Sequence, residues 1–252
     1  MQVAKVGPLE NPQLRGRLVL VTGAARRVGR ALARASAIAG ADVVIHYHRA
    51  TEEAAEALQE MQGLGRQAWT LQADLEDPEQ AAHLVDRASA LGPLYGLVNS
   101  AASFDSRPMQ ATARSDWART LAINLTAPFV MAQAFAAHLP PETQGRVVNI
   151  LDWRALRPDN THFAYSITKA ALAAMTRSLA LALAPMVSVN GLALGAILPP
   201  VGEAAGPDVI ASVPAHRWGS LREVEEALVF LLAGPAYVTG EIIHVDGGRH
   251  LV

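Results

Sequence analysis

A tyrosine and a lysine, Tyr165 and Lys169, stand four residues apart where a helical pattern of apolar residues begins. Residues at this spacing lie one turn apart on the same face of a helix. An ammonium group beside a phenol favours the phenolate, so Lys169 is expected to lower the pKa of Tyr165. A phenol with a lowered pKa can exchange a proton with a substrate near neutral pH. The pair alone is a weak signal, because the same spacing also occurs by chance on exposed helices.

Asp152 is a second residue with chemical potential. An apolar run at 147–151 precedes it and predicts a buried strand that ends at this carboxylate. Parallel α/β sheets bind ligands at the carboxyl ends of their strands, so Asp152 is expected at a ligand-binding edge. The alternative is a structural carboxylate that caps a helix or pairs with Arg154 or Arg157.

The elements that must position these groups alternate along the chain. Apolar, β-branched runs predict strands at 17–22, 43–47, 67–72, 94–98, 147–151, 187–193 and 241–245. Helical patterns separate them at 30–39, 51–61, 78–90, 117–138, 163–183 and 221–232, with Thr51 as a predicted cap and Pro128 as a predicted kink. Repeated βα units predict an α/β, single-domain, Rossmann-type doubly wound parallel sheet of about seven strands, with helices on both faces.

The composition is that of one globular domain. The chain has 252 residues, of which 51% are hydrophobic and 17% charged. A net charge of -2 gives no support for nucleic-acid binding, and the absence of cysteine excludes disulfides and cysteine metal sites. No apolar run of signal-peptide or membrane-span length stands out, so we expect a cytoplasmic protein without a membrane partner.

The predicted domain boundaries are simple. Residues 1–14 are expected to form a loose N-terminal leader, and residues 15–252 one nucleotide-binding domain. A stretch near 194–214 contains Pro199, Pro200, Gly202, Gly206, Pro207 and Pro214. It is either a substrate loop that acts as a lid or a surface excursion, and its place after a strand favours the lid.

A glycine-containing turn joins the first predicted strand to the first helix. The segment 22–29 reads Thr-Gly-Ala-Ala-Arg-Arg-Val-Gly. Gly23 can take a tight turn, Gly29 permits close packing, and the helix N-terminus offers free N–H groups to a pyrophosphate. An ordinary strand-to-helix turn is the alternative for this segment alone.

The end of the second predicted strand indicates the choice of cofactor. Folds that bind NAD usually place an acidic residue there for the ribose hydroxyls, but this chain has Tyr-His-Arg-Ala at 47–50. The basic residues near this edge are Arg26, Arg27, His48 and Arg49. They favour a 2′-phosphate and hence NADPH over NADH, unless they only extend into water. His46 and His48 lack a third ligand, so no metal site is predicted.

Taken in order, the motifs resemble those of the single-domain short-chain dehydrogenases/reductases from about Arg15 to the C-terminus. The matching residues are Thr22-Gly23 with Gly29, Asp74, Asn99 with Ala101, Asn124, Tyr165 with Lys169, and Asp246-Gly247-Gly248. Three positions depart from the usual pattern. Arg27 replaces the middle glycine of the loop, Asp152 replaces the catalytic serine, and Leu194-Gly195 replaces Pro-Gly. The first two departures, with His46–Arg49 and Asn99–Phe104, resemble the pteridine reductases and the bacterial dihydromonapterin reductases.

The resemblance implies roles for individual residues. The implied catalytic residues are Asp152, Tyr165, Lys169 and Asn124. The implied cofactor-binding residues are Gly23, Arg26, Arg27, Val28, His48, Arg49, Ala50, Asp74, Leu75, Asn99, Ala101, Tyr165 and Lys169. The implied substrate-binding residues are Arg27, Phe104, Asp152, Tyr165 and Gly195. In this scheme Phe104 stacks on a flat pterin ring, and Asn124 helps to position Lys169 and a water. Burial is expected to raise the pKa of Asp152, which would then donate a proton toward a ring nitrogen. Alternatively, an ionised Asp152 would accept hydrogen bonds from the N–H groups that a pterin presents.

These expectations define an NADPH-dependent reductase that transfers hydride to a dihydropterin-type substrate. One alternative is a general carbonyl or 3-oxoacyl thioester reductase. Another is an NADP(H)-binding sensor without catalysis, but such a protein is expected to have lost Tyr165 or Lys169. Related enzymes pair through the helices that match 117–138 and 163–183, so we expect a homodimer or homotetramer. The other expected partner of the protein is a small-molecule substrate.

Overall fold

The computed structural model describes residues 14–199 and 206–252. Of the leader predicted at 1–14, only Leu14 lies within the described residues, and its side chain is buried. The central part of the predicted substrate loop, 200–205, also lies outside them.

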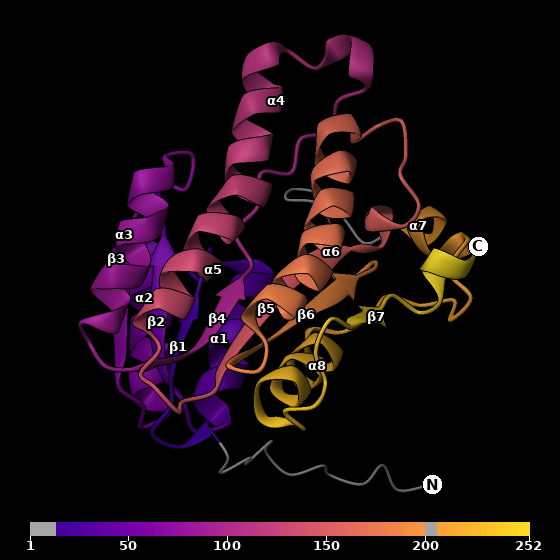
Figure 1. Ribbon diagram of the computed structural model, residues 1–252. Helices are drawn as coiled ribbons and strands as arrows, with labels where there is room; N and C mark the ends of the chain where they lie inside the picture. Colours follow the sequence, from indigo (N-terminus) through magenta and orange to yellow (C-terminus); the bar gives the residue numbers. More distant parts are fainter. Residues whose placement is uncertain (1–13, 200–205) are drawn as a thin grey trace, which may run out of the picture.

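Seven parallel strands form one sheet, in the order β3-β2-β1-β4-β5-β6-β7 (Figure 1). The strands are β1 (Leu18–Val21), β2 (Asp42–Tyr47), β3 (Ala68–Gln72), β4 (Leu94–Asn99), β5 (Gly145–Asp152), β6 (Val187–Leu194) and β7 (Ile242–Val245). The strand order reverses between β1 and β4, which places a crevice at their carboxyl ends. The prediction of a doubly wound parallel sheet is confirmed.

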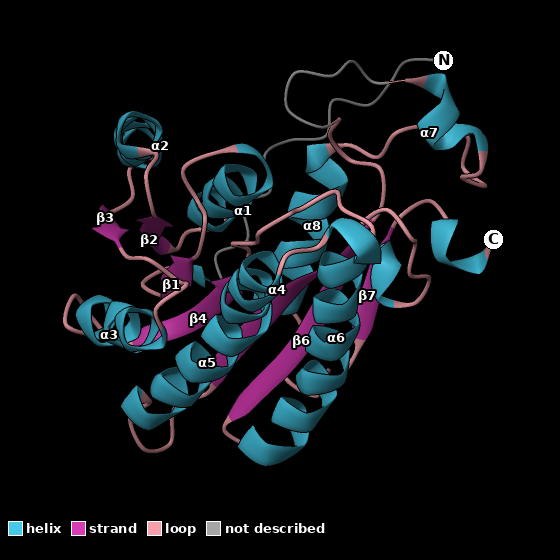
Figure 2. Ribbon diagram, turned by 90° about the horizontal axis from the view of Figure 1, so that it is seen from above, coloured by secondary structure: helices cyan, strands magenta, loops and turns pink. Residues whose placement is uncertain are grey.

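Helices cover both faces of the sheet (Figure 2). The first face carries α1 (Arg27–Ile38), α2 (Thr51–Gly63) and α8 (Leu221–Ala233), and the second carries α3 (Pro78–Ser89), α5 (Ala127–His138) and α6 (Phe163–Leu183). In β1, Val19 and Val21 join the core of the first face, while Leu18 and Leu20 join the core of the second. Successive side chains of a strand point to opposite faces, so a strand covered on both sides must be apolar throughout.

The helix predicted at 117–138 is two helices. α4 (Arg114–Leu121) and α5 are joined by a π-helical turn, η3 (Ala122–Thr126). Pro128 follows in the first turn of α5, so the irregularity lies before the proline rather than at it. A proline has no N–H for the carbonyl four residues earlier, which here belongs to Asn124. Wide turns of this kind often mark functional sites.

The predicted cap at Thr51 is wrong. Ala50 occupies the N-cap position of α2, and no side chain caps that end. Glu52 and Glu53 lie in the first turn, where carboxylates favour the positive end of the helix dipole. At other helices side chains do cap, because Asp77 accepts N–H groups of α3, and Ser220 forms a capping box with Glu223 in α8.

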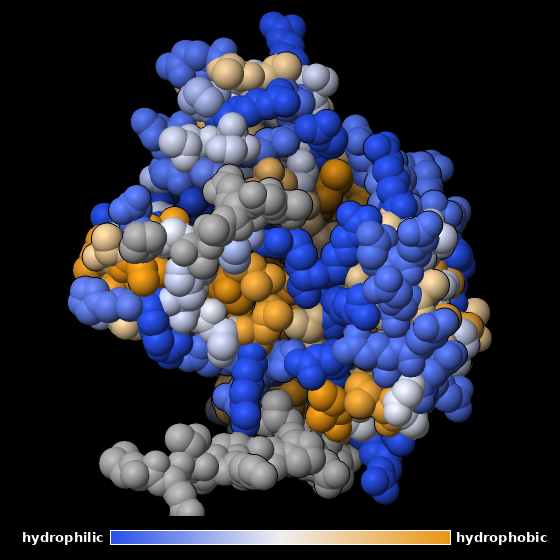
Figure 3. All heavy atoms as spheres, turned by 180° about the vertical axis from the view of Figure 1, so that it is seen from behind, coloured by the Kyte–Doolittle hydropathy of each residue, from blue (hydrophilic) through white to orange (hydrophobic). Residues whose placement is uncertain are grey.

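One helical segment of the described chain, Arg114–His138, is long and apolar enough to cross a membrane by length and composition alone. Core helices of globular proteins meet the same criteria, and this segment packs against α3, α6 and β4. Elsewhere, apolar side chains such as Leu181 and Phe230 reach the surface. The view from behind shows a largely hydrophilic surface interrupted by apolar patches (Figure 3).

Candidate functional site

The first wall of the site is the turn that follows β1. Thr22 Oγ1 accepts hydrogen bonds from Ser100 N at 2.9 Å and from Ala101 N at 3.0 Å, which ties the end of β1 to the end of β4. Gly23 has a φ of +64°, a left-handed conformation that glycine adopts at little cost. A Cβ added to Gly29 would lie 2.1 Å from the carbonyl oxygen of Gly23, so only glycine allows α1 to approach this turn. α1 begins at Arg27, three residues earlier than predicted.

The His46 side chain holds the turn after β1 in place. Gly23 N donates to His46 Nδ1 at 3.0 Å, and Nε2 lies 3.2 Å from the carbonyl oxygen of Ala73. Burial lowers the pKa of His46 to about 4, so the ring is neutral at pH 7 and Nδ1 can accept. Both ring nitrogens are engaged within the fold, which explains His46 without a metal ion. Sequence reasoning missed this structural role.

A cleft of about 470 Å³ opens beside the turn. It is lined by Gly23, Ala25, Arg26, Tyr47, His48, Arg49, Ala50, Asp74, Glu76, Arg119 and Ile123. Six residues predicted to bind the cofactor are therefore brought together. The ion pair between Arg26 and Glu53, at 2.5 Å, leaves the Arg26 side chain more than half exposed. A glycine-lined turn, basic side chains and Asp74 suit a dinucleotide with a 2′-phosphate.

Other residues from the same prediction lie elsewhere. Arg27 Nη2 donates to the carbonyl oxygen of Pro199 at 2.6 Å and so links α1 to the segment after β6. Val28 packs against the core, and the Leu75 side chain is buried. Asn99 is buried and donates to Asn149 Oδ1 at 2.8 Å. The side chains of Leu75 and Asn99 belong to the interior and that of Val28 is partly buried, which the residue motif alone could not show.

Tyr165 and Lys169 lie on α6 and are both buried, but they do not bond to each other. Lys169 Nζ donates to the carbonyl oxygen of Ile150 at 2.7 Å and lies 5.6 Å from the centre of the Tyr165 ring. Tyr165 Oη donates instead to Asp152 Oδ2 at 3.1 Å. The structure thus brings three of the four predicted catalytic side chains together, with Asp152 rather than Lys169 as the immediate partner of the phenol.

The pKa shifts overturn one expectation. Burial, reinforced by the nearby Asp152 carboxylate, raises the pKa of Tyr165 well above its usual value. Burial lowers the pKa of Lys169 to about 8, against the opposing effect of Asp152. The predicted lowering of the Tyr165 pKa is therefore wrong for this state, because the desolvation of a phenolate outweighs an ammonium that is not in contact. Tyr165 is a neutral phenol that holds its proton.

Asp152 acts as an acceptor in every hydrogen bond it makes among the described residues. It accepts from Tyr165 Oη, from Arg154 N at 2.9 Å and from Arg154 Nη1 at 3.3 Å. Its expected role as a proton donor toward substrate stays a prediction. The alternative is observed, because Asp152 caps the short turn η4 (Trp153–Ala155) and pairs with Arg154.

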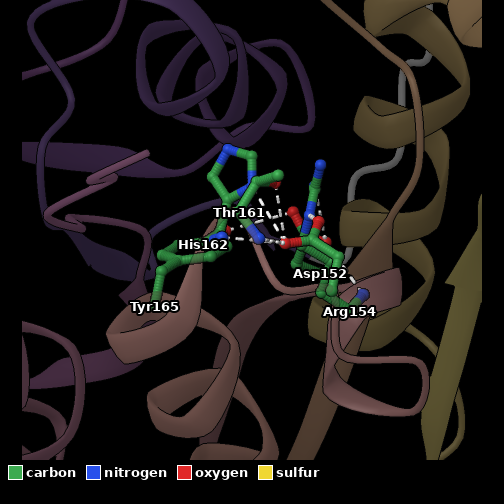
Figure 4. A network of polar contacts seen from close by, with 6 residues as sticks. Asp152, Arg154, Thr161, His162 and Tyr165 are labelled. Carbon is green, nitrogen blue, oxygen red and sulfur yellow. Dashed lines mark hydrogen bonds and ion pairs between the residues drawn. The ribbon is translucent and has the colours of Figure 1, made fainter. Parts of the chain in front are cut away.

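A polar network in the loop between β5 and α6 was not predicted (Figure 4). Arg154 Nε donates to Asp159 Oδ2 at 2.5 Å, and Asp159 Oδ1 accepts from the N–H groups of Thr161 and His162. Burial opposes ionisation of Asp159, but these hydrogen bonds hold its pKa well below its usual range. The sequence signal was the Asp-Asn-Thr triplet, which is typical of an Asx turn. Through Arg154, the network fixes the orientation of Asp152.

Phe104 and Asn124 reach the same site from other elements. The half-exposed Phe104 ring meets Tyr165 edge-on, with ring centres 4.7 Å apart. Asn124, in the π-turn, accepts from Ser103 N at 2.8 Å and donates to Ser103 O and Thr168 Oγ1. It therefore holds the segment that carries Phe104 against α6, and its side chain does not bond to Lys169 in the described structure.

Gly195 has a packing reason to be glycine. A Cβ there would lie 2.6 Å from the Cα of Asp246, and its N–H donates to the carbonyl oxygen of Val245. The structure gives the residue a role in joining β6 to β7, and its predicted contact with substrate remains a prediction.

Comparisons with known proteins agree with this architecture. A family model described as enoyl-(acyl carrier protein) reductase matches residues 23–250. A short-chain type dehydrogenase/reductase of Picea abies is 32% identical, and the aligned region covers 94% of this chain and 93% of the relative. The 3-oxoacyl-[acyl-carrier-protein] reductase FabG of Aggregatibacter actinomycetemcomitans is 32% identical, with coverages of 91% and 98%. A crystal structure of FolM alternative dihydrofolate reductase 1 from Brucella canis, complexed with NADP, is 34% identical, with a TM-score of 0.87 and coverages of 95% and 96%.

Proposed function

The chain belongs to the short-chain dehydrogenases/reductases, and from that membership we propose that this oxidoreductase uses NADPH to reduce a dihydropterin-type substrate. The observation that carries the substrate class is the Asp152 carboxylate in contact with the Tyr165 hydroxyl. The exposed Phe104 ring beside Tyr165 supports it. So does the likeness to FolM alternative dihydrofolate reductase.

The Asp152 carboxylate favours the reduction of a pterin over the reduction of a ketone. A ketone oxygen needs a hydrogen-bond donor, whereas an ionised carboxylate only accepts and repels the alkoxide that develops during ketone reduction. A pterin ring carries N–H groups, which Asp152 can accept. Phe104 adds an aromatic face against which a flat ring can pack. The three side chains together suit a nitrogen heterocycle better than a ketone.

The residues divide the chemistry between them. The cleft that Gly23, Arg49 and Asp74 line would hold NADPH, which would supply the hydride for an electrophilic ring carbon. Tyr165, which keeps its proton because of burial, donates it to the adjacent ring nitrogen, so that a C=N bond becomes CH–NH. Lys169 stabilises the phenolate left behind, and Asp152 holds the ring by its N–H groups. Water then restores the proton of Tyr165.

A product assay tests this proposal. Purified protein, NADPH and a 7,8-dihydropterin should give the tetrahydropterin, one molecule for each NADPH consumed, as identified by mass spectrometry. NADPH consumption without tetrahydropterin, together with efficient reduction of ketones, would contradict the proposal. The FabG relative and the description of the matching family model make 3-oxoacyl thioester reduction the second candidate, and the same assay with acetoacetyl thioesters measures it.

The cofactor preference should depend on Arg49, which lines the cleft beside the glycine turn. Arg49→Glu should raise the Kd of NADPH by about 10- to 100-fold, because a charged hydrogen bond is lost and a repulsion is gained. The Kd of NADH, which lacks the 2′-phosphate, should stay within about threefold. Fluorescence titration checks both values. Arg114→Glu, the same charge change at an exposed residue outside the cleft, is the control, and equal losses in both variants would contradict the assignment.

The pH dependence of kcat/KM should report Lys169. Its pKa, lowered by burial to about 8, lies below the value in the unfolded chain, so the ammonium is present below pH 8 and is lost above it. With NADPH saturating, kcat/KM should be level below about pH 8 and should fall at higher pH. Asp152 raises the Lys169 pKa, so Asp152→Asn should move this fall to lower pH. A profile that stays level to pH 10 would contradict the assignment.

We also propose that the chain assembles into a dimer or tetramer. Exposed apolar side chains lie on the two helices that are predicted to pair. They are Phe129 on α5, and Ile167 and Leu181 on α6. Light scattering coupled to size-exclusion chromatography tests this, and a monomer at micromolar concentration would contradict it.

A further inference from the structure

His162 stands at the start of α6, beside both aromatic residues of the site. Its ring centre lies 4.7 Å from that of Phe104 and 6.5 Å from that of Tyr165. Its side chain is 12% exposed, so the ring is a wall of the site rather than a surface group. Nothing in the chemistry described above uses it.

One edge of the His162 ring is held by the polar network (Figure 4). Nδ1 lies 2.7 Å from Thr161 Oγ1 and 3.2 Å from Asp159 Oδ1. The Thr161 hydroxyl donates its own hydrogen bond to Asp159 Oδ1, at 2.9 Å. The Asp159 carboxylate can only accept, so the arrangement that satisfies all three contacts has both oxygens accepting and the proton on Nδ1. In the neutral ring, Nε2 is then the acceptor.

Nε2 has no hydrogen-bond partner within residues 14–199 and 206–252. In the open site water can satisfy it. A flat substrate packed beside Phe104 and Tyr165 displaces that water, and an unpaired acceptor then weakens binding. A substrate that offers an N–H group to Nε2 avoids this loss.

We propose that His162 is a specificity-determining residue that accepts a hydrogen bond from a substrate N–H through Nε2. This inference rests on the proposed function and sharpens it. A dihydropterin carries N–H groups on its ring and its amino substituent, whereas the reacting end of a 3-oxoacyl thioester offers only carbonyl oxygens. Asp159, bonded to Arg154, orients His162, and Arg154 also holds Asp152. One network thus presents two acceptors near Tyr165, and both select for a donor-rich ring.

Three variants test the proposal. His162→Phe keeps an aromatic ring but removes the acceptor, and it should raise both the KM and the Kd of a dihydropterin about 10- to 100-fold. Its kcat should stay within about threefold, and kcat/KM for acetoacetyl thioesters should not fall. His162→Gln, whose amide oxygen can accept, should recover part of the affinity. His138→Phe, the same change at an exposed histidine paired with Asp86, is the matched control and should alter neither substrate.

The Kd is measured calorimetrically with 7,8-dihydrobiopterin and the protein saturated with NADP+, so it does not depend on turnover. An unchanged Kd in His162→Phe would overturn the inference. Equal losses for dihydropterin and thioester would also overturn it, because they would indicate a purely structural role. Wild-type protein that binds a dihydropterin but converts none would contradict the proposed function, while the Kd series would still decide the role of His162.

Discussion

Replacing Tyr165 with phenylalanine should reduce kcat for dihydropterin reduction by about 10³-fold, because loss of a positioned proton donor removes 10²- to 10⁴-fold of catalysis. The hydroxyl is the only group removed, and its one hydrogen bond to a described residue is to Asp152 at 3.1 Å. Burial keeps the proton on Tyr165, so the residue is ready to act as the acid throughout the neutral range. Stopped-flow and steady-state measurements of NADPH absorbance check the loss.

Two further measurements make the Tyr165 result specific. The Kd of NADPH should change by less than about threefold, and the melting temperature by only a few degrees. Tyr95→Phe is the matched control, since Tyr95 Oη donates to the carbonyl oxygen of Leu232 far along the chain and takes no part in the site. Tyr165→Phe with turnover near that of Tyr95→Phe would show that Tyr165 is not the acid.

Asp152→Ser should change which substrate is reduced. A serine hydroxyl can donate to a ketone oxygen, while the carboxylate that accepts pterin N–H groups is lost. We expect kcat/KM for a dihydropterin to fall about 100-fold, and kcat/KM for acetoacetyl thioesters to stay level or rise. Serine can still accept from Arg154 N, so the short turn after β5 should persist.

Asp152→Asn serves as the companion variant. It keeps the size of the side chain but removes the charge, so it separates the effect of the carboxylate from that of shape. Its loss of dihydropterin reduction should be smaller than that of Asp152→Ser if its carbonyl oxygen still accepts an N–H group. Equal losses for dihydropterin and thioester in both variants would remove the reason to assign a pterin substrate.

The sequence predicted most of the fold because parallel strands and amphipathic helices carry strong periodic signals. Helix α6 begins and ends where it was expected, at Phe163 and Leu183. The start of α1 was missed by three residues, because Arg27 opens the helix with a left-handed φ of +52° that its residue type does not suggest. The π-turn around Asn124 was also missed, since one wide turn hardly disturbs a helical pattern.

The site was predictable where residues match a motif and unpredictable where tertiary contacts decide. Tyr165, Lys169 and Asp152 meet as expected, but the spacing of Tyr165 and Lys169 could not show that Lys169 bonds to Ile150 O. Burial then reverses the expected shift of the Tyr165 pKa. Similarly, Arg154, Asp159 and His162 sit in a loop without periodicity, and only the folded chain brings them to Asp152.

The most direct test of the account is the ratio of two kcat/KM values for the wild-type protein, one for a 7,8-dihydropterin and one for an acetoacetyl thioester, both with saturating NADPH. Two acceptors beside a neutral phenol should favour the dihydropterin by about 100-fold or more, from 1–3 kcal/mol for each unsatisfied group. A ratio that favours the thioester, with no tetrahydropterin formed, would contradict the central claim.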